Sequence, residues 1–109
     1  MATTRDELSP EAQAFLKALA SPTRQAIMWE FADGELTVTE VAERLGLAQS
    51  AASTHLATLR DAGLLISRRE WKTVHYRPDP AAFLRSLEDL RGHLLACCPP
   101  AETDTGGDD

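Results

Sequence analysis

The sequence contains few of the features that mark secreted or membrane-spanning proteins. Two cysteines among 109 residues are too few for a disulfide scaffold, so reduced thiols are expected. The longest apolar runs, such as residues 63–66, are far shorter than the roughly 20 residues that a membrane-spanning helix needs. Residues 1–6 do not have the apolar stretch of a signal peptide. We therefore expect a cytoplasmic protein with one domain and no membrane partner.

Motifs that mark enzymes are also missing. The sequence contains no glycine-rich phosphate-binding loop, no nucleophile motif and no pair of acids with a plausible cleft. We therefore expect a protein that is not an enzyme and that requires no cofactor for its basic activity.

Charge is distributed unevenly along the chain. The formal net charge of −6, taken alone, would argue against a nucleic-acid partner. However, residues 44–77 contain six basic and two acidic side chains, a local charge of +4, whereas residues 102–109 contain four carboxylates and no base. Because phosphate binding depends on the local patch rather than on the whole-chain sum, this distribution is compatible with DNA binding.

Capping signals and apolar spacing predict five helices. Ser9-Pro10-Glu11 and Ser21-Pro22-Thr23 each combine an N-cap hydroxyl with a proline at the first helical position. Thr37 and Glu40 have the spacing of a capping box. Apolar side chains recur at helical spacing after each start signal. The expected helices cover about residues 10–20, 22–33, 37–45, 49–62 and 80–96.

Downstream of residue 63 the apolar pattern changes from a helical to a strand-like period. Residues 65–69 and 73–77 are predicted as the strands of a hairpin that turns at residues 70–72. The order of elements is therefore α-α-α-α-β-β-α. This mainly α fold with a small β-hairpin is typical of a winged helix-turn-helix.

The chain divides into two tails and one folded unit. We expect residues 1–8 to form a disordered tail, and residues 97–109 to form a segment with two adjacent cysteines and an acidic disordered end. Residues 9–96 form the expected DNA-binding and dimerisation domain. The first and last helices of this domain carry more apolar side chains than a core of this size covers, so we expect a homodimer through these two helices. These side chains are Phe15, Leu16, Leu19, Phe83, Leu87, Leu90 and Leu94.

Residues 37–62 carry the clearest functional pattern. Two short helices joined by Gly46-Leu47 form a helix-turn-helix, whose second helix can lie in the major groove of DNA. The side chains expected on its exposed face are short and polar, so they can approach base edges and phosphates. They are Gln49, Ser50, Ser53, Thr54 and His55. Simple solvation of an exposed helix face is the alternative role for such residues.

The predicted hairpin is basic. We expect its cations to contact phosphates or the minor groove beside the recognition helix. These cations are Arg68, Arg69, Lys72 and Arg77. Together with the glycine turn and the order of elements, they favour a double-stranded DNA operator as the partner. The alternative, a protein-interaction module that uses this fold without DNA, is disfavoured by the +4 charge of residues 44–77.

Three segments resemble the ArsR/SmtB family of metal- and metalloid-responsive repressors. They are residues 17–24 (KALASPTR), 45–56 (LGLAQSAASTHL) and 59–65 (LRDAGLL), and the resemblance covers about residues 10–96. It implies a dimer built from the first and last helices, repression in the inducer-free state and release of DNA when an inducer binds.

Two residues depart from the family pattern. Ala48 stands where the family usually has an N-cap serine, so the start of the recognition helix is less well capped. Trp71 stands at the hairpin tip, where glycine is common. The sequence leaves two roles open for Trp71: it can pack on the sugar-phosphate backbone of DNA or on the partner subunit.

The inducer sites best known in this family are not matched here. The two cysteines of its thiol site are replaced by Thr37 and Thr39. The family's zinc-type site on the last helix needs an Asp-x-His pair with a later His and Glu. Glu88, Asp89 and His93 do not have that spacing.

Cys97 and Cys98 are left as the candidate inducer site. Adjacent thiols can chelate a soft, thiophilic centre. Two thiols satisfy a methylated trivalent arsenical, whereas arsenite needs a third donor from the partner chain or from a small thiol. His93, four residues before Cys97, also permits a mixed nitrogen and sulfur site for zinc. We therefore expect a repressor that leaves its operator when As(III) binds these two thiols.

Other roles for the two cysteines stay open from the sequence. They can fill apolar space where the last helix meets a partner subunit, since free cysteine is commonly buried. They can also bind another thiophilic metal or act as an oxidation or persulfide switch, although such sensors generally place their cysteines on separate elements. A repressor without any inducer is the remaining alternative.

Overall fold

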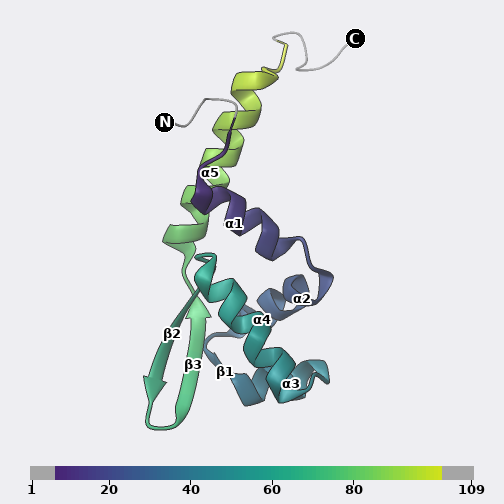
Figure 1. Cartoon of the computed structure of the whole chain (residues 1–109), viewed down its shortest axis with the longest axis vertical. Helices are drawn as coiled ribbons and strands as arrows, with labels where there is room; N and C mark the ends of the chain where they lie inside the picture. Colours follow the sequence, from purple (N-terminus) through teal and green to yellow (C-terminus); the bar gives the residue numbers. More distant parts are fainter. Residues whose placement is uncertain (1–6, 102–109) are drawn as a thin grey trace.

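The computed structural model describes residues 7–101, which form five helices and a small antiparallel sheet (Figure 1). The predicted order of helices and hairpin strands is confirmed, and the structure adds a short strand and a 3-10 turn. The elements are α1 (Pro10–Leu19), α2 (Pro22–Glu30), η1 (Phe31–Asp33), β1 (Leu36–Thr37), α3 (Val38–Leu45), α4 (Gln49–Asp61), β2 (Leu65–Glu70), β3 (Thr73–Pro78) and α5 (Pro80–Cys97). Residues 1–6 and 102–109, which make up most of the predicted tails, lie outside the described residues.

The predicted capping residues begin three of the helices. Ser9 and Ser21 each accept a hydrogen bond from the backbone N–H three residues later, at 3.1 and 3.2 Å. Thr37 and Glu40 form a reciprocal capping box, with distances of 3.1 and 2.8 Å. Ala48 has no side-chain acceptor, so the start of α4 lacks a cap that is typically worth about 1 kcal/mol.

The hydrophobic core lies between the buried face of α4 and the helices and sheet that pack against it. Ile27, Val41, Leu56 and Leu59 are fully buried there, and Tyr76 of β3 closes the core from the side of the sheet. These residues come from α2, α3, α4 and the hairpin, so the core fixes the helix-turn-helix and the base of the hairpin in one unit.

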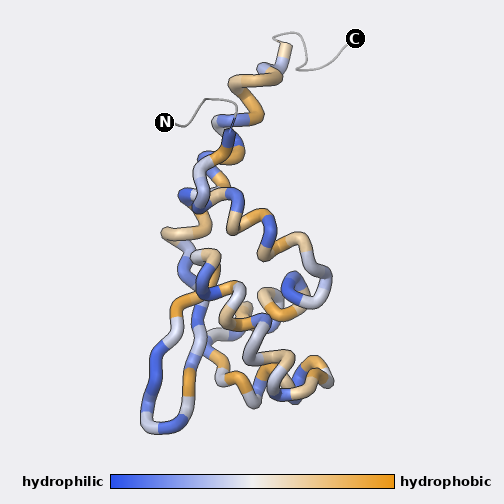
Figure 2. Tube along the Cα trace, viewed as in Figure 1, coloured by the Kyte–Doolittle hydropathy of each residue, from blue (hydrophilic) through white to orange (hydrophobic). Residues whose placement is uncertain are grey.

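Helix α5 extends away from this core over much of its length (Figure 1). Of its residues, Ala82 and Ser86 are buried, whereas Leu84, Leu87 and Leu94 are 56%, 43% and 51% exposed. Figure 2 shows apolar residues recurring along the helix to its far end. The described chain alone therefore leaves an apolar surface on α5 uncovered. Within residues 7–101, no helix combines the length and hydropathy required to cross a bilayer.

The sheet has the strand order β1-β3-β2, with both neighbouring pairs antiparallel. Glu70 is the last paired residue of β2, so the hairpin loop contains Trp71 and Lys72 alone and is one residue shorter than the predicted turn at residues 70–72. The sequence did not predict β1, because two residues are too few to show a strand period. In addition, Thr37 carries the N-cap signal of α3, which predicts a helix rather than a strand at this residue.

A polar contact ties the start of α1 to α5. Oγ of Ser9 donates a hydrogen bond to Oδ2 of Asp89 at 2.5 Å, and the backbone N–H of Ser9 donates to the same oxygen at 3.2 Å. These bonds, the side-chain bond first, lower the pKa of Asp89 below its ordinary value. Ser9 thus caps α1 and anchors it to α5 at the same time.

The lowered pKa of Asp89 makes a testable prediction about stability. A carboxylate whose pKa is lower in the folded state stabilises the fold above its unfolded pKa of about 3.9, and this stabilisation is lost as the pH falls through the folded value. We expect Asp89→Asn to unfold at lower urea concentration than the wild type near neutral pH. The difference should shrink below about pH 4.

Urea unfolding at a fixed protein concentration, repeated over a pH series, measures this difference. Glu88→Gln is the matched control, because Glu88 forms an exposed ion pair with Arg91 on the same helix. An Asp89→Asn protein with the same pH dependence as the wild type would contradict a structural role for this contact.

Candidate nucleic-acid interface and thiol pair

Helices α3 and α4 are held at a fixed angle by a tight turn. Gly46 has a φ of 65°, a left-handed conformation that favours glycine, and the backbone N–H of Leu47 bonds to the carbonyl of Ala42 at 2.9 Å. Ala52 and Leu56 of α4 pack into the core. The opposite side of α4 is therefore left in solvent. Its exposed residues are Gln49, Ser50, Ser53 and Thr54, as the sequence predicted.

His55 lies apart from these four residues. The sequence predicts it on the exposed face, but the structure half-buries it against α2. Its Nδ1 accepts a hydrogen bond from Nη1 of Arg24 at 3.2 Å, and Nε of Arg24 donates to the carbonyl of Ala18 at 2.7 Å. The helical period explains the difference, because residue 55 lies three or four positions from the buried Ala52 and Leu59.

A groove of about 720 Å³ separates the start of α4 from the hairpin. Its walls come from three parts of the fold, namely the start of α3, the start of α4 and the tip of the hairpin. Four predicted DNA-contacting residues line it together: Gln49, Ser50, Ser53 and Lys72. Gln49 is oriented by a 3.0 Å hydrogen bond from its Nε2 to Oγ1 of Thr39. The groove is thus a polar surface between α4, the recognition helix, and the β2–β3 hairpin, which we call the wing.

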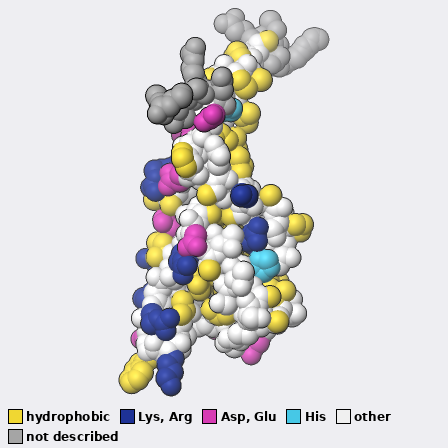
Figure 3. All heavy atoms as spheres, in the orientation of Figure 1, with side chains coloured by type: hydrophobic (Ala, Val, Ile, Leu, Met, Phe, Trp, Pro, Cys, Tyr) yellow, Lys and Arg dark blue, Asp and Glu magenta, His cyan; other side chains and the backbone are white. Residues whose placement is uncertain are grey.

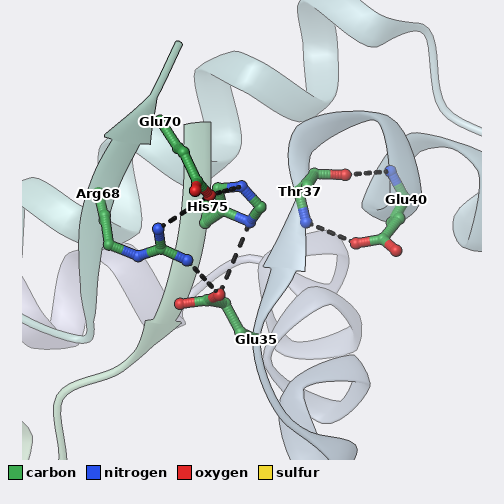
Figure 4. Close-up of polar contacts among 6 residues, drawn as sticks. All are labelled: Glu35, Thr37, Glu40, Arg68, Glu70 and His75. Atoms are coloured by element: carbon green, nitrogen blue, oxygen red, sulfur yellow. Dashed lines mark hydrogen bonds and ion pairs between the residues drawn. The ribbon is translucent and has the colours of Figure 1, made fainter. Parts of the chain in front are cut away.

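Arg68 is engaged within the protein (Figure 4). Its Nη2 lies 2.7 Å from Oε1 of Glu35, and its Nη1 lies 3.2 Å from Oε1 of Glu70. His75 lies 3.6 and 3.5 Å from the same two carboxylates. The hydrogen bond with Glu35 is the main cause that raises the pKa of Arg68. The sequence missed this cluster because Glu35 lies outside the hairpin. The Arg68 and Glu70 pair, two residues apart on one strand face, was the available signal.

The other hairpin cations are exposed. Within residues 7–101, no ion pair involves Arg69, Lys72 or Arg77. Figure 3 shows Lys and Arg side chains following the hairpin to its tip. These three cations are therefore available to phosphates, whereas Arg68 must first leave two carboxylates.

Cys97 and Cys98 form an exposed thiol pair at the end of α5. Their sulfur atoms lie 3.0 Å apart, and Sγ of Cys97 also donates to the carbonyl of Leu94 at 3.4 Å. The contact with Cys98 is the main cause that raises the pKa of Cys97, which disfavours its thiolate form. Helix α5 includes Cys97, one residue beyond the predicted end of the folded domain.

No third metal ligand accompanies this thiol pair in residues 7–101. The described range contains no group of three His, Cys, Asp or Glu side chains placed to hold a metal ion, and His93 does not complete one. Within one described chain the pair therefore offers two donors, which suits a centre that binds two thiols.

Comparisons with known proteins agree with this geometry. A helix-turn-helix domain family matches residues 19–68. The transcriptional activator HlyU of Vibrio cholerae is 47% identical over 82% of this chain and 81% of its own. The arsenic resistance transcriptional regulator ArsR1 of Pseudomonas putida is 45% identical over 73% of this chain and 68% of its own. A solved HlyU structure from Vibrio cholerae covers 80% of this chain and 92% of its own, with 39% identity and a TM-score of 0.61.

The fold and the polar face of α4 define a winged helix-turn-helix regulator that binds DNA. The relatives are transcription regulators rather than enzymes, as the sequence predicted. The chain belongs to the ArsR/SmtB family of transcription regulators.

The ion pairs of the hairpin predict a difference between two neighbouring arginines. Arg69→Ala is expected to weaken binding to all DNA sequences and to flatten the salt dependence of binding by about one unit per lost contact and subunit. Arg68→Ala is expected to leave this salt dependence nearly unchanged, because Glu35 and Glu70 already neutralise Arg68.

Fluorescence anisotropy over a salt series measures both slopes, with a short duplex that the wild type selects from a random-sequence pool. Lys72→Ala is the positive control, since Lys72 lines the groove beside α4. If Arg68→Ala and Arg69→Ala flatten the salt dependence of DNA binding equally, Arg68 also contacts phosphate when DNA is bound.

Proposed function

We propose that this protein is a homodimeric repressor that holds an operator in duplex DNA and is released when a trivalent arsenical binds Cys97 and Cys98. The observation that carries the proposal is the pair of exposed sulfur atoms, 3.0 Å apart, at the end of the uncovered helix α5. ArsR1 of Pseudomonas putida, an arsenic resistance regulator by name, supports the choice of inducer.

The dimer in this proposal forms through α1 and α5. The exposed leucines of α5 have no cover within the described chain, and Leu16 of α1 adds to the same kind of surface. Burial of these side chains against a two-fold related copy removes them from water. Such a dimer presents two recognition helices to successive major grooves, which are about 34–36 Å apart.

DNA binding in this proposal uses the face that contains the groove. Gln49, Ser50 and Ser53 of α4 approach base edges, and Thr54 lies on the same exposed side. Arg69, Lys72 and Arg77 supply positive charge along the wing. The acidic total of −6 does not oppose this contact, because the carboxylates of residues 102–109 are separated in sequence from the basic stretch.

Arsenical binding follows from the chemistry of neutral thiols. Each Cys S–H condenses with an As–OH group, which forms one As–S bond and releases one water molecule. Methylarsenite has two such hydroxyl groups and is satisfied by Cys97 and Cys98. Arsenite keeps one hydroxyl, which a small thiol or a donor of the partner chain can replace. Because the thiol proton leaves in water, the raised pKa of Cys97 does not oppose this reaction.

The coupling to DNA acts through the end of α5. A ligand shifts an equilibrium only when its affinities for the two states differ. Closure of both sulfur atoms on one arsenic reorders the last turn of α5, where Cys97 now bonds to the carbonyl of Leu94. This change rotates the two recognition helices out of register. A coupling of this type is typically worth about 1–3 kcal/mol, or roughly 5- to 150-fold in DNA affinity.

Cysteine substitution tests the proposal. Cys97→Ser and Cys98→Ser are each expected to bind the selected duplex like the wild type and to keep it when methylarsenite is added, because one thiolate cannot chelate. The anisotropy of labelled duplex measures release. If both variants release DNA at the methylarsenite concentration that releases the wild type, the sensing site lies elsewhere.

Two further arms of this experiment separate arsenic from other signals. Cadmium binding requires thiolates and releases protons, so its effect should weaken as the pH falls, whereas condensation with methylarsenite should depend little on pH. Hydrogen peroxide tests a second candidate that the 3.0 Å sulfur contact favours, oxidation of the two thiols to a disulfide with release of two water molecules. Release by peroxide alone would replace arsenical sensing with redox sensing.

A further inference from the structure

The tip of the wing carries an exposed tryptophan. Trp71 is 89% exposed and is the first residue of the two-residue loop between β2 and β3. Its φ of 60° places it in the left-handed region, where glycine is normally favoured. Trp71 is the only non-glycine residue with a positive φ in residues 7–101. A large aromatic side chain therefore occupies a strained position without burying its indole in the fold.

The surroundings of Trp71 are suited to DNA. Lys72 follows it in the loop and lines the groove beside the recognition helix, and Arg69 lies on the adjoining strand. Both cations are exposed and, within the described range, outside the ion pairs of the protein. Figures 2 and 3 show the hydrophilic and cationic character of the hairpin tip. Glu70, which directly precedes Trp71, is paired with Arg68, so the unpaired charges near the ring are those of Arg69 and Lys72. An apolar ring beside two such cations complements a polyanion with stacked bases.

The partner subunit is a poor match for Trp71. The uncovered leucines lie on α1 and α5, and α5 runs toward the opposite end of the molecule from the hairpin tip (Figure 1). The longest dimension of the chain is 55 Å, along the axis that separates these two ends. The groove, in contrast, is lined by Lys72 and by the start of α4 together. The tip therefore belongs to the DNA-binding face.

We propose that Trp71 inserts its indole ring into the minor groove of duplex DNA and partly unstacks one base step beside the sequence that α4 reads. The flanking cations hold the tip against the phosphates on either side of that groove. Apolar wedges between base steps are an established way for proteins to deform the duplex from its minor groove. The wedge adds selectivity for flexible pyrimidine–purine steps that the recognition helix does not touch. This inference rests on DNA binding by the proposed wing surface.

Substitutions at the hairpin tip distinguish the contribution of the indole ring to DNA affinity from the contribution of the positive charges. Trp71→Gly removes the ring and places at this positive φ a residue that adopts it without strain, so the wing should stay folded. Its affinity for the selected duplex is expected to fall by about 5- to 100-fold, with the salt dependence unchanged. Trp71→Phe should lose less, because an aromatic ring is kept. Lys72→Ala is the matched control that flattens the salt dependence instead.

Two fluorescence readouts locate the ring. Trp29→Phe leaves Trp71 as the only tryptophan, and its quenching by acrylamide should decrease when duplex DNA is added. Trp71→Phe leaves Trp29, which lies on α2 and is also exposed, as the control that stays unprotected. In addition, 2-aminopurine moved stepwise along the flank of the duplex should brighten at one step with the wild type and at none with Trp71→Gly.

The outcomes distinguish the wedge from DNA binding as such. If the wild type binds no duplex DNA, both the proposed function and the wedge are overturned. If the wild type binds and Trp71→Gly binds equally well, or no 2-aminopurine position responds, the wedge alone is overturned. If acrylamide quenching of Trp71 decreases when the protein concentration is raised without DNA, the ring lies instead in a contact between subunits.

Discussion

Burial of one face of α4 is the constraint on which the functional surface depends. Ala52, Leu56 and Leu59 have no exposed surface, so the rotation of α4 about its axis is fixed by the core. Gln49 and Ser53 are then necessarily on the outside. The base of the hairpin joins the same core through Tyr76, and this shared core sets the distance between the recognition helix and the wing.

The same core is too small to cover α5. It ends near the first turns of that helix, where Ala82 and Ser86 are buried, and the later leucines lie beyond it. The hydrogen bonds between Ser9 and Asp89 orient α1 on α5 without covering them. Helix α5 therefore carries both the uncovered apolar surface of the proposed dimer and the thiol pair that is proposed to bind the ligand. A structural change at the thiols can thus alter how the two subunits pack. This position is the physical basis for proposing that a change at the thiols reaches the DNA-binding face.

The features of this fold that depend on local chemistry can be predicted from the sequence. Helix starts followed from Ser9, Ser21 and the Thr37 capping box, because hydroxyl caps act within one turn. Features that depend on distant parts of the chain were missed. The strand β1 exists only because β3 lies beside it, and Arg68 meets Glu35 across 33 positions. The hydrogen bond between His55 and Arg24 of α2 also joins distant parts of the chain, although the period of α4 by itself places residue 55 beside the buried face.

In the proposed mechanism, one thiol-bound arsenical per chain separates the dimer from its DNA. Native mass spectrometry of the complex with the selected duplex, during stepwise addition of methylarsenite, can follow this release, because it resolves subunits, DNA and arsenic together. We expect two populations: a DNA-bound dimer without arsenic and a DNA-free dimer with one methylarsenic group on each chain. A dimer that carries methylarsenic on both chains and still holds the duplex would contradict this mechanism.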